Sequence, residues 1–174
     1  ELYLKRLLQN INQPVYLEVP QDLFDLLIKT YEEDLQYWNF NITKTLLKKL
    51  AFLFKHDQKR MSETDIFLMN VILLMSCQGH KFPISPSSGQ SQQWNKQSIQ
   101  EWETIFLLNC LAFYQKLLIF PKPIINPSLD LSMLFEKTLR KLQAIFLLGH
   151  YFNNSPCPRL AVHLFSIVTT IGQD

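Results

Sequence analysis

Cysteine and histidine side chains occur in two short pairs whose residue types are those of zinc ligands. Cys77 and His80 are separated by two residues, whereas Cys157 and His163 are separated by five. Structural zinc sites repeat short ligand pairs at defined spacing, but these two pairs differ in spacing and lie about eighty residues apart. We therefore expect no metal and no cofactor. We interpret the cysteines as buried free thiols of a protein in a reducing intracellular compartment, the cytoplasm or the nucleus.

Nucleophilic catalysis requires a cysteine or serine beside a base. Cys110 lies in the middle of a strongly apolar stretch, where burial raises the pKa of a thiol and keeps it unreactive. The chain has only four glycines and lacks the nucleophile-elbow, phosphate-loop and dinucleotide-binding patterns. The sequence therefore predicts a protein that is not an enzyme.

The composition favours contact with another protein. Apolar residues make up 47% of the chain and charged residues only 18%, so one small domain has more apolar surface than it readily hides. Four large side chains cluster around the longest loop: Phe82, Ile84, Trp94 and Trp102. Aromatic residues are common anchors at interfaces, and we hypothesise that these four form a partner-binding face. The alternative is that they cover the end of a helical bundle.

A basic face forms a second candidate site. Five cationic side chains follow one another at helical spacing and in the turn after it: Lys44, Lys48, Lys55, Lys59 and Arg60. Three interpretations are open: a solvated face, a face paired with the acidic side of the preceding helix, or a surface for nucleic acid or anionic lipid. The formal net charge of +2 does not indicate an overall nucleic-acid binder. Phosphate binding is therefore an alternative function, and it would weaken steeply with salt.

Hydrophobic periodicity predicts about seven helices and no strand. The expected helices cover residues 2–11, 20–38, 44–55, 63–77, 98–120, 131–152 and 158–171, with a long polar loop at 79–95 and a proline-rich link at 120–129. The sixth of these helices carries an apolar stripe from Leu131 to Phe146, and Gly149 weakens its end. Thr43 or Asn41, Ser62, Ser98 and either Ser128 or Asp130 are the expected capping residues. No apolar run reaches the ~18 residues of a membrane span.

Residues 98–120 are apolar on nearly every face, which predicts that this helix is buried in the middle of the domain. Residues 63–77 form the second buried helix. The fold class is therefore all-α: an irregular multi-helix bundle, or a solenoid-like array of the HEAT or armadillo type. We expect one helical domain over residues 1–174, cut from a longer chain.

These observations together predict a non-enzymatic protein–protein interaction module, a helical scaffold subunit of a larger intracellular complex. An apolar and aromatic face would take a helix or peptide from a partner protein. A further alternative is a carrier of a small apolar ligand, with a cavity between helices 63–77, 98–120 and 158–171.

Overall fold

The computed structural model describes residues 14–34, 42–78, 94, 96–119, 130–154 and 158–171 of the 174-residue chain. These residues form six α-helices and contain no strand, which confirms the all-α prediction for this part of the chain. The helices are α2 (Gln21–Asp34), α3 (Lys44–His56), α4 (Glu63–Cys77), α5 (Lys96–Tyr114), α6 (Leu131–Asn153) and α7 (Pro158–Ile171). A 3₁₀ turn covers Gln58–Arg60, and a π-helical turn covers Gln115–Ile119 directly after α5. The predicted helix 2–11, the loop 79–95 except Trp94, and the link 120–129 lie outside the described residues.

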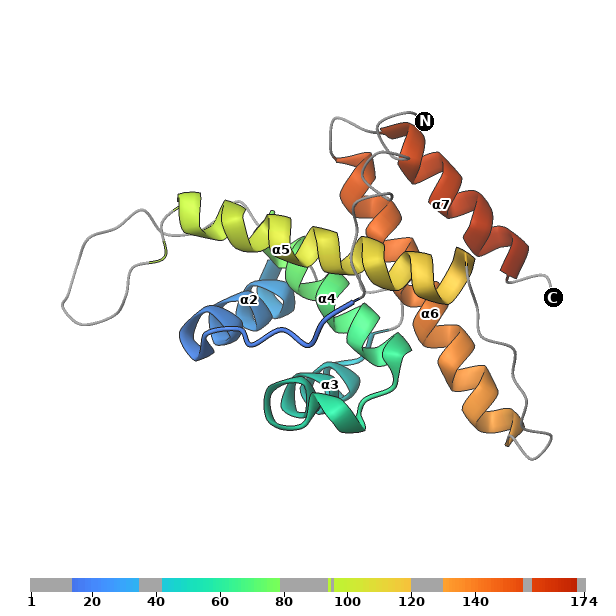
Figure 1. Cartoon of the computed structure of the whole chain (residues 1–174), viewed down its shortest axis with the longest axis horizontal. Helices are drawn as coiled ribbons and strands as arrows, with labels where there is room; N and C mark the ends of the chain where they lie inside the picture. Colours follow the sequence, from blue (N-terminus) through green and yellow to red (C-terminus); the bar gives the residue numbers. More distant parts are fainter. Residues whose placement is uncertain are drawn as a thin grey trace.

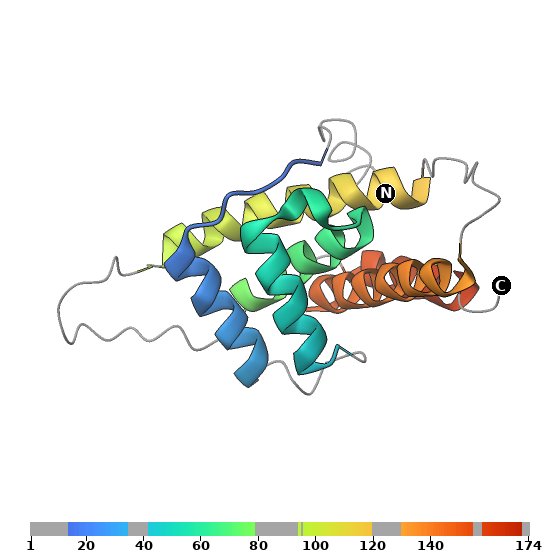
Figure 2. The same ribbon diagram turned by 90° about the horizontal axis from the view of Figure 1, so that it is seen from below.

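Helix α4 lies at the centre of the molecule (Figures 1 and 2). It packs against α2, α3, α5 and α6, and α7 packs in turn on α6. Helices α2 and α3 lie on one side of α4, and α6 with α7 lie on the other (Figure 1). One continuous hydrophobic cluster takes side chains from all six described α-helices.

The sequence placed the helix at residues 98–120 in the centre, and the structure corrects this. Helix α5 covers one face of α4 and keeps an open side, on which Ile105 is 39% exposed and Leu108 is 42% exposed. In α4, by contrast, every residue from Ile66 to Cys77 is buried. The difference follows from charge, because α4 has no charged side chain after Asp65, whereas α5 carries Glu101 on its exposed side. A helix that is apolar all round needs neighbours all round.

Local capping fixes where several helices begin. The Ser62 Oγ accepts a hydrogen bond from the Asp65 backbone N–H at 3.1 Å and donates one to the Asp65 carboxylate at 2.8 Å. Thr43 caps α3 by accepting from the Leu46 N–H at 3.2 Å, and Asp130 caps α6 by accepting from the Ser132 N–H at 3.1 Å. These caps confirm three of the predicted helix starts.

The fourth predicted start is wrong by nearly one turn, because a helix capped by Ser98 would begin at residue 99. Helix α5 begins at Lys96, so Ser98 lies within its first turn and is not the N-cap. Lys96 and Gln97 are good helix formers, and the helix extends through them toward the N-terminus.

Candidate functional site

The N-terminal half of α6 carries an exposed apolar stripe, which is the strongest candidate binding surface on the described residues. The exposed fractions are 80% for Leu131, 54% for Met133, 37% for Leu134 and 69% for Phe135. This end of α6 projects away from α2, α3 and α4 in Figure 1. Leu131, Leu134 and Phe135 follow one another at three- and four-residue spacing on one side of α6, and we call these three residues the α6 stripe.

The sequence predicted one continuous apolar stripe from Leu131 to Phe146. The structure exposes its first residues, half-buries Leu139, Leu142 and Phe146, and fully buries Ile145. From Gln143 onward α6 packs between α4 and α7, and Ala144, Ile145, Leu147 and Leu148 are fully buried. Arg140 lies 3.6 Å from the Asp65 carboxylate, at the first turn of α4. The preceding residues, 131–139, add roughly 14 Å of helix at 1.5 Å per residue. This part of α6 therefore extends beyond the start of α4, where α4 offers no surface to cover it.

Cationic side chains lie beside the α6 stripe. Lys137 is exposed, and Lys141 is half-buried, so that desolvation lowers the pKa of its amine. No ion pair of Lys137 or Lys141 occurs among the described residues, whereas Arg140 pairs with Asp65 and also donates to the Gln143 side chain at 3.1 Å. An acidic group on a binding partner would stabilise the charged form of Lys141.

Of the four residues predicted to bind a partner, Trp94 and Trp102 lie in the described part of the chain, and Phe82 and Ile84 lie outside it. Both tryptophans are half-buried and pack against the core. The Trp94 indole N–H donates to the Asp22 carboxylate at 2.8 Å, which connects α2 to a residue two positions before α5. The Trp102 ring lies 5.6 Å from the Phe106 ring. A partner-binding role for these residues stays a prediction.

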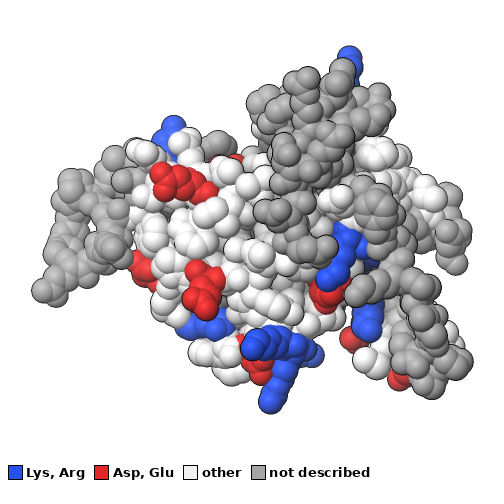
Figure 3. All heavy atoms as spheres, viewed as in Figure 1, with Lys and Arg blue, Asp and Glu red and all other residues white. Residues whose placement is uncertain are grey.

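The predicted basic face is partly neutralised within the molecule. The Lys55 amine lies 4.0 Å from the Asp25 carboxylate of α2, and the Arg60 guanidinium lies 2.8 Å from the Asp57 carboxylate. Lys44, Lys48 and Lys59 are exposed. In the space-filling view, basic atoms over α3 have acidic atoms beside them (Figure 3). The Lys55–Asp25 pair matches the interpretation in which α3 pairs with the acidic side of α2.

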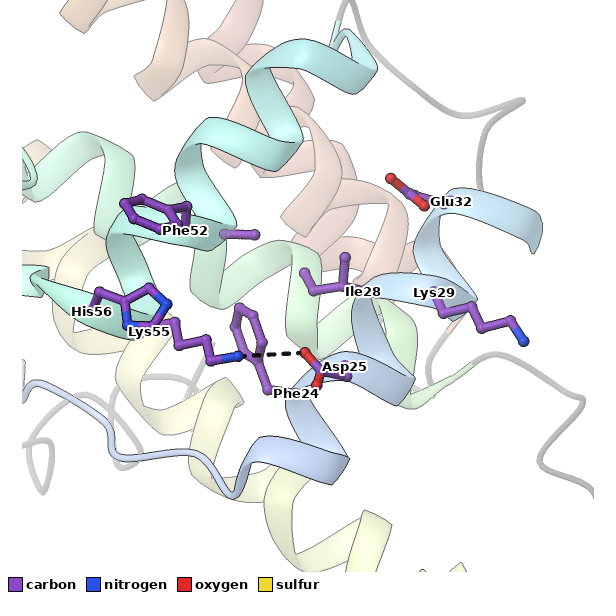
Figure 4. Close-up of a pocket in the computed structure, with 9 residues that line it drawn as sticks. Phe24, Asp25, Ile28, Lys29, Glu32, Phe52, Lys55 and His56 are labelled. Carbon is purple, nitrogen blue, oxygen red and sulfur yellow. Dashed lines mark ion pairs between the residues drawn. The ribbon is translucent and has the colours of Figure 1, made fainter.

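A shallow groove lies between α2 and α3, with a volume of about 320 Å³ (Figure 4). Its floor is apolar, and its rim carries both charge signs and an exposed aromatic ring, Phe52. The lining residues are Phe24, Asp25, Ile28, Lys29, Glu32, Ala51, Phe52, Lys55 and His56. The sequence contained no signal for this groove, because it depends on how two helices lie side by side.

Two buried asparagines form a polar contact that the sequence analysis missed. The Asn109 side-chain N–H₂ of α5 donates to the Asn70 side-chain oxygen of α4 at 3.0 Å, and the Asn70 N–H₂ donates to the Ile66 carbonyl at 2.9 Å. The same Asn109 amide contacts the backbone of Val15. In the sequence, Asn109 stood out only as a polar residue inside an apolar helix.

The buried thiols are poor nucleophiles. Desolvation raises the pKa of Cys110 well above its ordinary value, and desolvation together with the nearby Glu103 charge raises that of Cys77. The Glu103 carboxylate accepts a hydrogen bond from the Tyr151 hydroxyl at 2.9 Å, and burial keeps that phenol protonated by raising its pKa. Among the described residues, no three or more Cys, His, Asp or Glu side chains are grouped so that they could hold a metal ion. His80 and Cys157 are not among these residues.

Comparison with protein-family models, with curated proteins and with solved structures finds no match to this chain. None of the described helices combines the length and the apolar character that crossing a membrane requires.

Proposed function

We propose that this chain is a non-enzymatic protein–protein interaction module, a helical scaffold that binds a partner through the α6 stripe. The observation that carries the proposal is the exposure of Leu131 and Phe135, at 80% and 69%, on a helix that extends past the body of the domain. Contiguous exposed apolar side chains mark interaction surfaces, whereas single ones are ordinary.

The stripe has the form that suits a partner helix. Leu131, Leu134 and Phe135 recur at three- and four-residue spacing, so they lie on one side of α6. Amphipathic helices recognise each other through such anchors. Lys137 and Lys141 flank the stripe, which favours a partner with carboxylates beside its own apolar residues.

A charge introduced into the stripe tests this function. We expect the Phe135→Glu variant to lose a partner that the wild-type chain retains in quantitative affinity capture, because a buried, unpaired carboxylate is strongly unfavourable at an apolar interface. The measurement compares captured proteins by mass spectrometry, and circular dichroism establishes that the variant keeps its helices.

Phe52→Glu is the matched control, since Phe52 is also an exposed phenylalanine, at 64%, but lies on α3. A partner that is lost with Phe135→Glu and retained with Phe52→Glu supports the α6 stripe. Loss of a partner only with Phe52→Glu assigns binding to the α2–α3 groove and contradicts the proposal. The proposal is also contradicted if the wild type and both variants capture the same set of proteins.

The other proposed functions have separate signatures. Binding of nucleic acid or anionic lipid would fall steeply between low and physiological salt, whereas an apolar interface changes little. The residues proposed for it are Lys44, Lys48, Lys55, Lys59 and Arg60. A carrier of small apolar molecules would unfold at a higher temperature when its ligand is added. The residues Phe82, Ile84, Trp94 and Trp102 stay a second proposed partner surface, tested by alanine substitution in the same capture experiment.

A further inference from the structure

Helix α7 already covers the C-terminal half of the α6 face that carries the α6 stripe. The centre of the Phe165 ring of α7 lies 5.5 Å from that of Phe146 and 5.4 Å from that of His150 on α6. The same ring occupies the space beside Gly149. Gly149 follows Leu131 by 18 residues, about five turns of an α-helix, so both residues lie on one side of α6. The α6 stripe is therefore the uncovered continuation of the surface on which α7 packs.

Helix α7 ends before it reaches the α6 stripe. It lies beside α6 and runs antiparallel to it (Figure 1). Phe165 is level with residues 146–150, and the six residues from there to Ile171 add about 9 Å at 1.5 Å per residue. The end of α7 is therefore level with about residue 142 of α6. Beyond that level Leu131 and Phe135 are exposed.

The covered half of this face shows which side chains fit it. Helix α7 buries Ala161 and Leu164, which are each 1% exposed, and Phe165 packs against the core. These three residues follow one another at three- and four-residue spacing from Ala161, so they lie on one side of α7. A helix that continues along α6 from the end of α7 would pack with the same pattern, a small residue followed three and four positions later by large apolar ones.

The uncovered half of the face adds a requirement for charge. Lys137 and Lys141 lie one helical turn apart beside Leu134, and neither lysine has an ion pair among the described residues. Two carboxylates four positions apart on an occupying helix would face both amines. Lysines at those positions would bring like charges together, which is unfavourable.

We propose that the α6 stripe binds an acidic amphipathic helix of a partner protein, which runs antiparallel to α6 and continues the path of α7 along it. This inference rests on the proposed function and adds the chemistry and the orientation of the partner. Such a helix extends a helix–helix contact that the chain already makes, so α6 needs no rearrangement to receive it.

Two synthetic helical peptides of the same length as α7, 14 residues, test the chemistry of the occupant. Each contains the alanine, leucine and phenylalanine pattern of α7 twice, and the flanking positions are glutamate in one peptide and lysine in the other. We expect the glutamate peptide to bind the wild-type chain at least about tenfold more tightly than the lysine peptide in fluorescence anisotropy. The double variant Lys137→Glu, Lys141→Glu should reverse this preference.

The double variant Lys44→Glu, Lys48→Glu is the matched control. It changes the net charge by the same amount, and its two lysines are also four positions apart, but they lie on α3. We expect it to keep the preference of the wild type. Phe135→Glu should bind neither peptide, whereas Phe52→Glu should bind as the wild type does. Lys137→Glu alone, at an exposed position, replaces the double variant if that variant does not fold, and it should weaken the preference for the glutamate peptide.

A spin label near the start of α6 tests the orientation of the peptide. Ser132→Cys in a Cys157→Ser background places one reactive thiol beside Leu131, because Cys77 and Cys110 are buried. A nitroxide on this thiol should quench a fluorophore at the C-terminus of the glutamate peptide more strongly than one at its N-terminus. Stronger quenching at the N-terminus would show a parallel arrangement and overturn the continuation of α7.

Failure of this inference is distinguishable from failure of the proposed function, which the capture experiment tests without either peptide. Equal binding of both peptides that Phe135→Glu abolishes keeps the α6 stripe as a helix-binding surface and overturns the acidic partner. Binding that Phe135→Glu leaves unchanged places the peptide elsewhere and overturns the inference.

If neither peptide binds the wild-type chain, the proposed occupant is wrong. A dimer that increases with concentration in light scattering would then assign the α6 stripe to a second copy. A lower unfolding temperature of the Leu131→Ala variant would instead assign it to another segment of the same chain.

Discussion

Asn70 and Asn109 place uncharged amides inside the two helices that the sequence marks as most apolar. Their hydrogen bonds join α4 and α5, and then join α5 to the backbone of Val15, 94 residues away from Asn109. A buried amide tolerates few arrangements, since each misplaced partner leaves a polar atom unsatisfied. This pair therefore adds directional specificity to an interface that is otherwise held by non-directional apolar packing.

The two buried thiols make the free energy of unfolding depend on pH. Burial raises the folded-state pKa of Cys77 and Cys110, whereas an unfolded cysteine titrates at about 8.5. The contribution of these two thiols to the free energy of unfolding is fully present below about pH 8.5. It is lost as the pH rises from there toward the raised pKa values of the folded protein. We expect the free energy of unfolding to fall by up to about 1.4 kcal/mol per pH unit for each thiol in this range. Urea unfolding between about pH 8 and pH 10 measures this slope.

The Cys110→Ala variant identifies the source of the slope. It removes one titrating group, so its free energy of unfolding should fall less steeply with pH than that of the wild type. Equal slopes in both proteins would show that the Cys110 thiol is not responsible.

At the scale of elements, α6 and α7 approach closely at one glycine. A Cβ atom built on Gly149 would lie 2.6 Å from Cε1 of the Phe165 ring, which packs against Phe146 and His150. The absence of a side chain at Gly149 thus leaves room for the Phe165 ring of the neighbouring helix. Helix α6 passes through Gly149 and continues to Asn153.

A double-mutant cycle tests this contact. We expect Gly149→Ala to lower the free energy of unfolding by about 1–3 kcal/mol, because the added methyl group displaces the Phe165 ring. In a Phe165→Ala background the same change should be neutral or stabilising by up to about 1 kcal/mol, since alanine is the better helix former. Urea unfolding of the four proteins gives the coupling energy. The same destabilisation in both backgrounds would contradict the steric explanation.

At the scale of the whole molecule, one core joins all six described α-helices around α4. Two leucine-to-alanine substitutions compare the core with the α6 stripe. Leu73 of α4 is fully buried, and we expect Leu73→Ala to reduce the free energy of unfolding by about 2–5 kcal/mol. Leu131 is 80% exposed, and Leu131→Ala should change the free energy of unfolding by less than about 0.5 kcal/mol.

Chemical denaturation followed by circular dichroism and by tryptophan fluorescence measures both variants, and coincident transitions establish that the core unfolds as one unit. A large loss of stability in Leu131→Ala would mean that the α6 stripe is covered in solution.

Local features of the sequence determined the helices that the structure describes. The bounds predicted for residues 63–77 and 158–171 agree with α4 and α7, and Thr43, Ser62 and Asp130 cap the helices that they were expected to cap. These features are readable because each capping bond joins residues two or three positions apart, and because apolar periodicity belongs to a single helix.

Only the tertiary structure decided which helix lies in the centre, how far along α6 the apolar residues are buried, and which group pairs with Asn109. Periodicity shows that a helix face is apolar, but it does not say whether a neighbour is long enough to cover that face. Leu131 and Ile145 share one apolar pattern, yet one is 80% exposed and the other is fully buried, because α6 extends past the start of α4. Contacts between segments as distant as Val15 and Asn109 depend on the path of the chain in space, and no local pattern specifies that path.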